Sequence, residues 1–96
     1  MDINISEKQD TFIMSVRGRL DAITAPELEK TISKYADSDK SKIILDFNEL
    51  EYISSAGLRV VLVTAKMMKT KQGELRVSGL KGTVKDVFEL SGFYTI

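Results

Sequence analysis

The sequence contains no cysteine and no histidine, and each absence excludes a class of function. Without cysteine there is no disulfide, no thiolate zinc site and no cysteine nucleophile. Without histidine the chain lacks the commonest general base and metal ligand, so a Ser-His-Asp triad is impossible and a serine nucleophile has no evident activator. We therefore expect a protein that is not an enzyme and that holds no metal or other cofactor.

An excess of charge of one sign is also missing, because fourteen basic and fourteen acidic residues cancel. No overall field would draw this chain to nucleic acid or to an anionic membrane. The sequence also lacks a run of about twenty apolar residues and a basic start followed by an apolar core, which membrane spans and secretion signals need. We expect a soluble, cytoplasmic protein that binds its partners through a local surface, without nucleic-acid binding or membrane insertion.

The 96 residues are 43% hydrophobic, which suits one folded domain over residues 1–96. Periodicity predicts strands at 11–17, stopped by Gly18, and at 42–47 and 74–78. Helices are expected from a Thr24–Glu27 capping box to residue 36, from 56 to about 71 before Gly73, and over 84–90 before Gly92. This order predicts a small α/β fold, with a mixed, mainly parallel sheet of about four strands packed with helices.

The most informative segment, residues 45–59, leads from a buried strand through a short loop into a helix that opens with two serines. The first turn of a helix has unpaired N–H groups and the positive end of the dipole, so it would hold a phosphate well. Serine is also a favoured N-cap, and most serines at helix starts only cap. Position alone leaves both interpretations open for Ser54 and Ser55.

Three segments carry a resemblance to a known family. Gly18-Arg19-Leu20-Asp21 with Thr24-Ala25 is similar to Gly-x-Leu-Asp-x-x-Thr-Ala; residues 45–58, from Leu-Asp-Phe to Gly-Leu, are similar to a central signature; and residues 90–93 match a closing segment. Together they span almost the whole chain. On these motifs the chain resembles the STAS domain family, in particular the stand-alone bacterial anti-sigma-factor antagonists.

The resemblance implies a partner switch. In that family a serine at the position of Ser55 is phosphorylated by a kinase that is itself the anti-sigma factor. The unphosphorylated antagonist binds this anti-sigma factor serine kinase and frees the sigma factor, and a metal-dependent serine phosphatase resets the switch. Many antagonists have Asp just before the phosphorylated serine where this chain has Ser54. We assign the phosphorylation to Ser55, two residues before Gly57, and keep Ser54 as the alternative.

Other residues near Ser55 are candidates for partner binding. Asp21, from the family's loop, and Asp46, which ends the strand before the serine turn, would orient the serine hydroxyl or contact the kinase, although Asp is also a common turn residue. At 100° per residue the second helix should bury Leu58, Val61, Leu62, Ala65 and Met68. Val60, Val63 and Met67 would form an apolar strip beside Arg59 on the other side. The partner-binding set is Asp21, Thr24, Asp46, Ser54, Ala56, Gly57, Arg59, Val60, Val63 and Met67.

Several alternatives stay open. Neighbouring helices, a partner or a second copy could cover the apolar strip, so we expect a monomer or a weak dimer. The chain could be an accessory or interaction subunit of another complex, in lipid transport or stress signalling, with Ser55 only a cap. A hydrolytic or nucleotide-binding domain using Ser55 with Asp46 is disfavoured by the missing histidine and the missing phosphate loop. A transporter C-terminal domain is a further interpretation by fold analogy alone.

Overall fold

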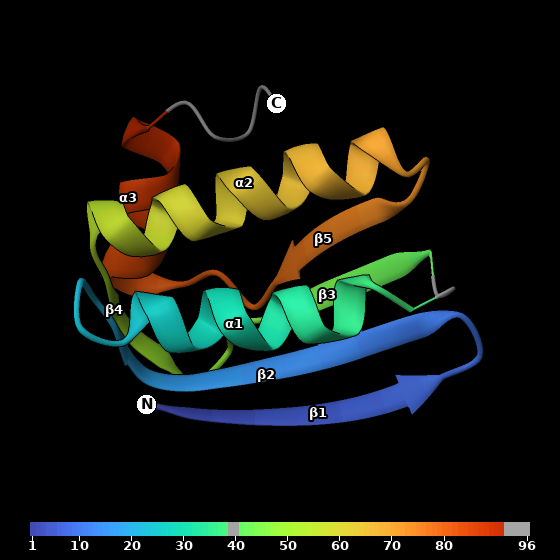
Figure 1. Cartoon of the computed structure of the whole chain (residues 1–96). Coiled ribbons are helices and arrows are strands. Elements are labelled where there is room, and N and C mark those ends of the chain that lie inside the picture. The colour runs from blue at the N-terminus through green and yellow to red at the C-terminus, as the bar shows by residue number, and fades with distance from the viewer. Residues whose placement is uncertain (39–40, 92–96) are drawn as a thin grey trace.

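The computed structural model describes residues 1–38 and 41–91 (Figure 1). Its strands are β1 (Asp2–Lys8), β2 (Thr11–Leu20), β3 (Lys42–Asp46), β4 (Leu50–Ile53) and β5 (Glu74–Ser78). Its helices are α1 (Ala25–Ala36), α2 (Ser55–Thr70) and α3 (Gly82–Leu90). The sheet order is β1-β2-β3-β5, with β4 beside β2, and only the β1–β2 pair of this described sheet is antiparallel. The expected mixed, mainly parallel α/β fold is confirmed, with five strands within residues 1–38 and 41–91 in place of about four.

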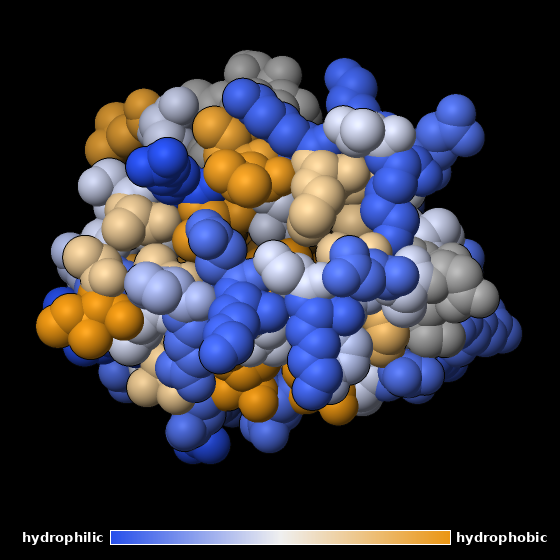
Figure 2. Space-filling view, in the orientation of Figure 1, coloured by the Kyte–Doolittle hydropathy of each residue, from blue (hydrophilic) through white to orange (hydrophobic). Residues whose placement is uncertain are grey.

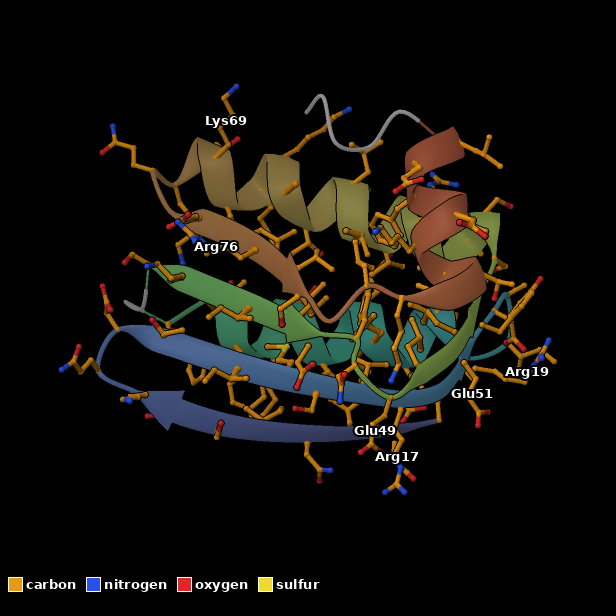
Figure 3. All side chains as sticks on the ribbon, turned by 180° about the vertical axis from the view of Figure 1, so that it is seen from behind. Arg17, Arg19, Glu49, Glu51, Lys69 and Arg76 are labelled. Atoms are coloured by element: carbon orange, nitrogen blue, oxygen red, sulfur yellow. The ribbon has the colours of Figure 1, made fainter. Side chains whose placement is uncertain are left out.

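Helices α1 and α2 lie side by side over one face of the sheet, and the view from behind shows the other face without a helical layer along β1, β2 and β3 (Figures 1 and 3). Alternation in β2 and β3 decides which side chains lie under the helices. Phe12, Met14, Val16, Ile43 and Leu45 are all at most 4% exposed and form the core with the helices. Burying each such side chain contributes about 1.5–3 kcal/mol, so this alternation fixes the register of the sheet.

Helix α1 packs its predicted apolar stripe against this core. Leu28 and Ile32 are buried as expected. Tyr35 is only half-buried, and its ring meets Phe12 edge-on with 4.8 Å between centroids. Helix α1 therefore packs against the sheet along one side, and its remaining faces are available for other contacts.

Two strands were missed by the sequence interpretation. β1 has only Ile3 and Ile5 to mark a buried side, because an edge strand covered on one face needs few apolar residues. β4 is four residues long and was assigned to the loop before the serines. Its two buried residues, Leu50 and Ile53, are three apart, which breaks the alternation expected of a strand.

Gly18 does not end β2, contrary to expectation. It has a φ of +95°, and the pairing of β2 with β4 shifts register between Gly18 and Arg19. Such a bulge bends the strand without ending it. The first half of β2 pairs with β3 and the last residues pair with β4, so the bulge carries β2 from one partner to the next. This bend brings Leu20 beside the start of α2.

The last helix begins at Gly82, two residues earlier than predicted, and ends at Leu90. The expected stop at Gly92 and the second half of the closing segment at 90–93 lie outside the described residues.

Candidate functional site

The two serines at the start of α2 have different roles. Ser54 is in an extended conformation before the helix, and its backbone N–H donates to the Leu20 carbonyl at 2.9 Å. Its side-chain oxygen accepts from the Gly57 N–H at 3.4 Å, and its carbonyl accepts from the Leu58 N–H at 3.0 Å. Ser54 is therefore the N-cap.

Ser55 is the first residue of α2 and is exposed. No hydrogen bond to its hydroxyl is found within residues 1–38 and 41–91. Since Ser54 already caps the helix, capping does not explain Ser55. Its hydroxyl is open to solvent at the end of the helix where the dipole favours an anion.

Alanine substitutions should separate the two roles. Ser54→Ala removes the capping oxygen and is expected to lower the free energy of unfolding by about 0.5–1 kcal/mol, the lower part of the usual range because the bond is long. Ser55→Ala should change it by less than about 0.5 kcal/mol. Urea unfolding of both variants measures this difference, and an equal or reversed ranking would show that Ser55 caps the helix.

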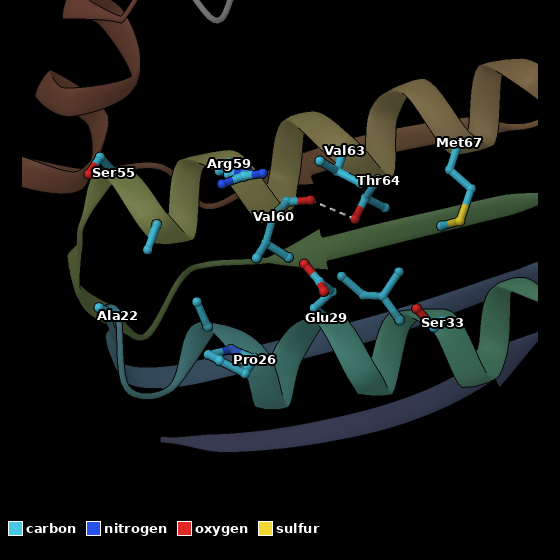
Figure 4. A pocket seen from close by; sticks show the side chains of 13 residues that line it. Ala22, Pro26, Glu29, Ser33, Ser55, Arg59, Val60, Val63, Thr64 and Met67 are labelled. Atoms are coloured by element: carbon cyan, nitrogen blue, oxygen red, sulfur yellow. Dashed lines mark hydrogen bonds between the residues drawn. The ribbon is translucent and has the colours of Figure 1, made fainter.

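A groove of about 900 Å³ runs between α1 and α2, with Ser55 and Ala56 at one end. Figure 4 shows Arg59, Val60, Val63 and Met67 along the α2 wall and Pro26, Glu29 and Ser33 along the α1 wall. In the space-filling view, apolar side chains gather in this region between more hydrophilic helix surfaces (Figure 2). The groove thus joins an exposed hydroxyl to an elongated, partly apolar surface.

The apolar strip on α2 is only partly as expected. Val60 is 4% exposed and belongs to the core, whereas Val63 is 46% exposed and Met67 is half-buried. Val60 is buried because α1 packs against α2 on this side. For this residue of the apolar strip, the cover is therefore a neighbouring helix of the same domain. Within the expected core stripe, Val61 and Met68 are buried, while Leu58, Leu62 and Ala65 are half-buried.

The α1 side of the groove was not found from the sequence. Pro26, Glu29 and Ser33 line it together with Ala22, which precedes the helix. The positions 26, 29 and 33 have helical spacing and form a second stripe beside the buried one. That spacing was the available signal, but it identifies a groove only when the neighbouring helix is known.

The loop before α1 is held by Asp21 and Thr24. One Asp21 carboxylate oxygen accepts from the backbone N–H groups of Ile23 and Thr24, at 3.0 and 3.1 Å. The Thr24 hydroxyl donates to the Arg19 carbonyl at 2.8 Å and accepts from the Asp21 N–H at 2.9 Å. Thr24 makes no side-chain cap bond, so the predicted capping box with Glu27 is wrong. The same two residues instead fix a loop that exposes Ile23.

The pKa of Asp21 lies below its usual range because the Thr24 N–H, and then the Ile23 N–H, donate to its charged form. A depressed folded-state pKa means that the carboxylate stabilises the fold above the unfolded pKa, about 3.9, and that this contribution is lost as pH falls through the folded pKa. A carbon-detected NMR titration should place the Asp21 midpoint below about 3.9. A midpoint at or above this value would contradict the hydrogen-bonded loop.

Asp46 does not lie in the groove. It follows Leu45 on β3, so alternation turns its side chain to the face of the sheet away from α1 and α2. There it accepts from the Ser15 hydroxyl at 3.3 Å and from the Asn48 N–H at 3.0 Å. The structure therefore brings Asp21, Thr24 and the start of α2 to one end of the molecule, with Val63 and Met67 further along the groove, but gives Asp46 a turn-forming role on another surface.

Gly57 is buried at the start of α2, where the helix approaches β2 and β4 most closely. A Cβ at this position would lie 2.7 Å from Leu20 Cγ and 2.8 Å from Ile53 Cγ1. The residue thus permits close packing and does not contact solvent. Arg59, by contrast, is exposed on the groove, one helical turn after Ser55.

Within the described ranges, no three acidic side chains come together as a metal site would need. None of the three helices in this part of the chain has the length and apolar character to cross a bilayer.

The sequence of this chain is similar to those of known proteins. BtrV of Bordetella bronchiseptica, provisionally named an anti-sigma factor antagonist, is 38% identical over all of this chain and 83% of its own length. The anti-sigma-B factor antagonist of Listeria monocytogenes is 30% identical over all of this chain and 87% of its own.

Two solved structures share the fold. A Thermotoga maritima protein provisionally described as an anti-sigma factor antagonist superposes with a TM-score of 0.91 at 20% identity, over 98% of this chain and 81% of its own. The phosphorylated form of the Bacillus protein SpoIIAA gives 0.79 at 21% identity, over 98% and 86%. The STAS domain matches residues 2–96. The chain belongs to the STAS domain family.

Proposed function

We propose that residues 1–96 act as one regulatory domain, an anti-sigma factor antagonist switched by phosphorylation of Ser55. The unphosphorylated chain would bind an anti-sigma factor serine kinase in the cytoplasm and release its sigma factor. Phosphorylation by that kinase would end binding, and a metal-dependent serine phosphatase would restore it. The names of the curated relatives support the antagonist role. In this proposal the chain is a substrate and a binder, not an enzyme.

One observation carries the switch: Ser55 is exposed beside the groove, and its hydroxyl has no hydrogen-bond partner among the described residues, while Ser54 caps α2. A kinase can reach the Ser55 hydroxyl without breaking an interaction that holds the fold. A phosphate on Ser54 would instead be attached to the same oxygen that accepts from the Gly57 N–H as the N-cap. This difference favours Ser55 as the modified residue.

The helix can also hold the phosphate once it is added. A phosphoserine carries about −1.5 to −2 charges, and the first turn of α2 offers N–H groups and the positive end of the dipole. Arg59 is one turn further on, at the i+4 position whose side chain neighbours that of Ser55. Its guanidinium makes no ion pair within the described residues, so it is available to the phosphate. The modified state can therefore remain folded.

The partner surface would centre on the groove. Val63 and Met67 supply apolar contact, Arg59 and Ala56 lie between them and Ser55, and the loop fixed by Asp21 and Thr24 borders the same end. A partner packed over this surface would have to desolvate the phosphate, and mismatched charge at an interface costs several kcal/mol. A charge that prevents the partner from packing over the groove is enough to switch binding off.

Displacement of sigma factor tests the proposal. A preformed complex of a candidate anti-sigma kinase with its sigma factor is mixed with the purified chain and analysed by native mass spectrometry. The unmodified chain should replace the sigma factor, and the phosphorylated chain should not. If neither form displaces sigma factor from any candidate kinase of the same organism, the chain is an accessory subunit of another complex.

A further inference from the structure

Helix α2 carries basic residues that pair with no acidic group of the described chain. Its three charged residues are Arg59, Lys66 and Lys69, and none of its residues is acidic. All three side chains are exposed, and none makes an ion pair with a described residue. Since the whole chain has a net charge of zero, α2 concentrates positive charge that the rest of the chain balances elsewhere.

These cations lie on the same side of the helix as Ser55. At 100° per residue, Ser55, Arg59, Lys66 and Lys69 fall within about 80° of one another, opposite the buried side of α2. Figure 3 shows Lys69 projecting from α2 away from the sheet. A rise of 1.5 Å per residue places Lys69 about 15 Å along the axis from Arg59. The three cations, called the basic face below, thus begin one turn after the proposed phosphorylation site.

The neighbouring helices leave most of this charge unbalanced. Helix α1 is neutral and α3 has one net negative charge, from Glu27, Glu29, Lys30 and Lys34 in α1 and Lys85, Asp86 and Glu89 in α3. Glu29 lines the groove together with Arg59 and offsets part of its charge without forming an ion pair. Lys66 and Lys69 lie beyond the lining of the groove, so they remain available to a partner.

Apolar side chains among the cations favour a protein as that partner. Leu62 is half-buried and Val63 is 46% exposed, and protein interfaces combine such apolar contact with a polar rim. A nucleic acid would need a wider positive surface than this neutral chain offers. On the basis of the proposed function, we propose that the anti-sigma kinase presents an acidic surface that docks on the basic face, next to its contact with the groove.

Phosphorylation of Ser55 acts on the same attraction. A phosphate adds about −1.5 to −2 charges at the start of the basic face, so the three positive charges there fall to a net of about +1 to +1.5. Opposite charges on two proteins raise their association rate, and salt weakens this effect. The modified chain should therefore associate with the kinase more slowly, in addition to any loss of contact in the groove.

Stopped-flow kinetics of the purified chain with a candidate anti-sigma kinase test the acidic surface. The association rate constant should fall about tenfold between about 0.05 and 0.5 M NaCl, because salt screens exposed charges. At the lower salt concentration, Lys66→Glu should slow association about three- to tenfold. Lys66→Arg keeps the charge and should stay within about twofold of the original chain.

Lys8→Glu is the matched control. Lys8 is exposed on β1, on the other side of the sheet from α2 along the chain's edge, and its substitution makes the same change in net charge (Figure 1). This variant should associate within about twofold of the original rate, because the charge is far from the basic face. Circular dichroism and urea unfolding report whether each variant is folded.

The outcomes separate the acidic surface from the phosphorylation switch. If Lys66→Glu associates as fast as the original chain, or Lys8→Glu slows association equally, the acidic surface is overturned while the switch at Ser55 stands. The same holds if Lys66→Glu weakens binding only to duplex DNA or to phosphatidylserine vesicles. If no candidate kinase binds the chain at either salt concentration, the proposed function is wrong and the acidic surface is overturned with it.

Discussion

Phosphorylation of Ser55 is expected to weaken binding to the cognate anti-sigma kinase by at least about a hundredfold. The reason is local: the added charge would stand at the end of the α1–α2 groove, where a bound partner excludes water. An uncompensated charge in such a place costs several kcal/mol, and about 2.7 kcal/mol already gives a hundredfold loss. Isothermal titration of the modified and unmodified chains against the kinase measures this ratio.

Two variants separate charge from bulk at Ser55. Ser55→Glu adds one negative charge and should weaken binding about tenfold or more, less than phosphate because its charge is smaller. Ser55→Gln has nearly the same shape without charge and should bind several-fold more tightly than the Glu variant. Equal affinities for Glu and Gln would show that bulk, and not charge, operates the switch. If the phosphorylated chain binds the kinase with the same affinity as the unmodified chain, phosphorylation of Ser55 is not a switch.

Gly57→Ala is expected to destabilise the fold by about 1–3 kcal/mol, although Gly→Ala within a helix usually stabilises by up to about 1 kcal/mol. The sign reverses because the new methyl group would lie under 3 Å from Leu20 Cγ and Ile53 Cγ1. Both side chains are at most 3% exposed and have little room to move. Urea unfolding of the variant gives the change directly.

A double-mutant cycle identifies the cause. Leu20→Ala removes the nearest clashing atom at its own cost of about 2–5 kcal/mol. In that background, Gly57→Ala should be close to neutral or stabilising, a favourable coupling of at least about 1 kcal/mol. If Gly57→Ala stabilises the unmodified chain, or costs the same in both backgrounds, the close approach at Gly57 does not limit the packing of α2 against β2 and β4.

The sequence predicted the elements whose side chains are mostly buried or strictly periodic. The α1 stripe of Leu28 and Ile32, the buried alternation of β3 and the extent of α2 follow from solvent exclusion, which acts on local pattern. β4 escaped notice because four residues carry almost no periodic signal. Gly18 was misread because glycine is common both in β-bulges and at the ends of strands. Only the pairing with the neighbouring strand distinguishes the two cases.

For the candidate site, the segment was predictable but the contacts were not. The pair Ser54-Ser55 before an apolar helix pointed to the correct turn, whereas the division into a cap and an exposed hydroxyl depends on where the helix begins. The Thr24 hydroxyl turns away from α1 because the Arg19 carbonyl and Asp21 N–H compete for it. The groove needs both α1 and α2, and the burial of Val60 follows from their packing.

Site mapping of the phosphate tests the central claim most directly. The purified chain, its Ser54→Ala variant and its Ser55→Ala variant are incubated with ATP and candidate anti-sigma kinases, then analysed by intact mass and fragmentation. The proposal predicts a single phosphate on Ser55, retained in Ser54→Ala and absent from Ser55→Ala. Phosphate on Ser54, or a Ser55→Ala variant modified as fully as the original chain, would contradict it.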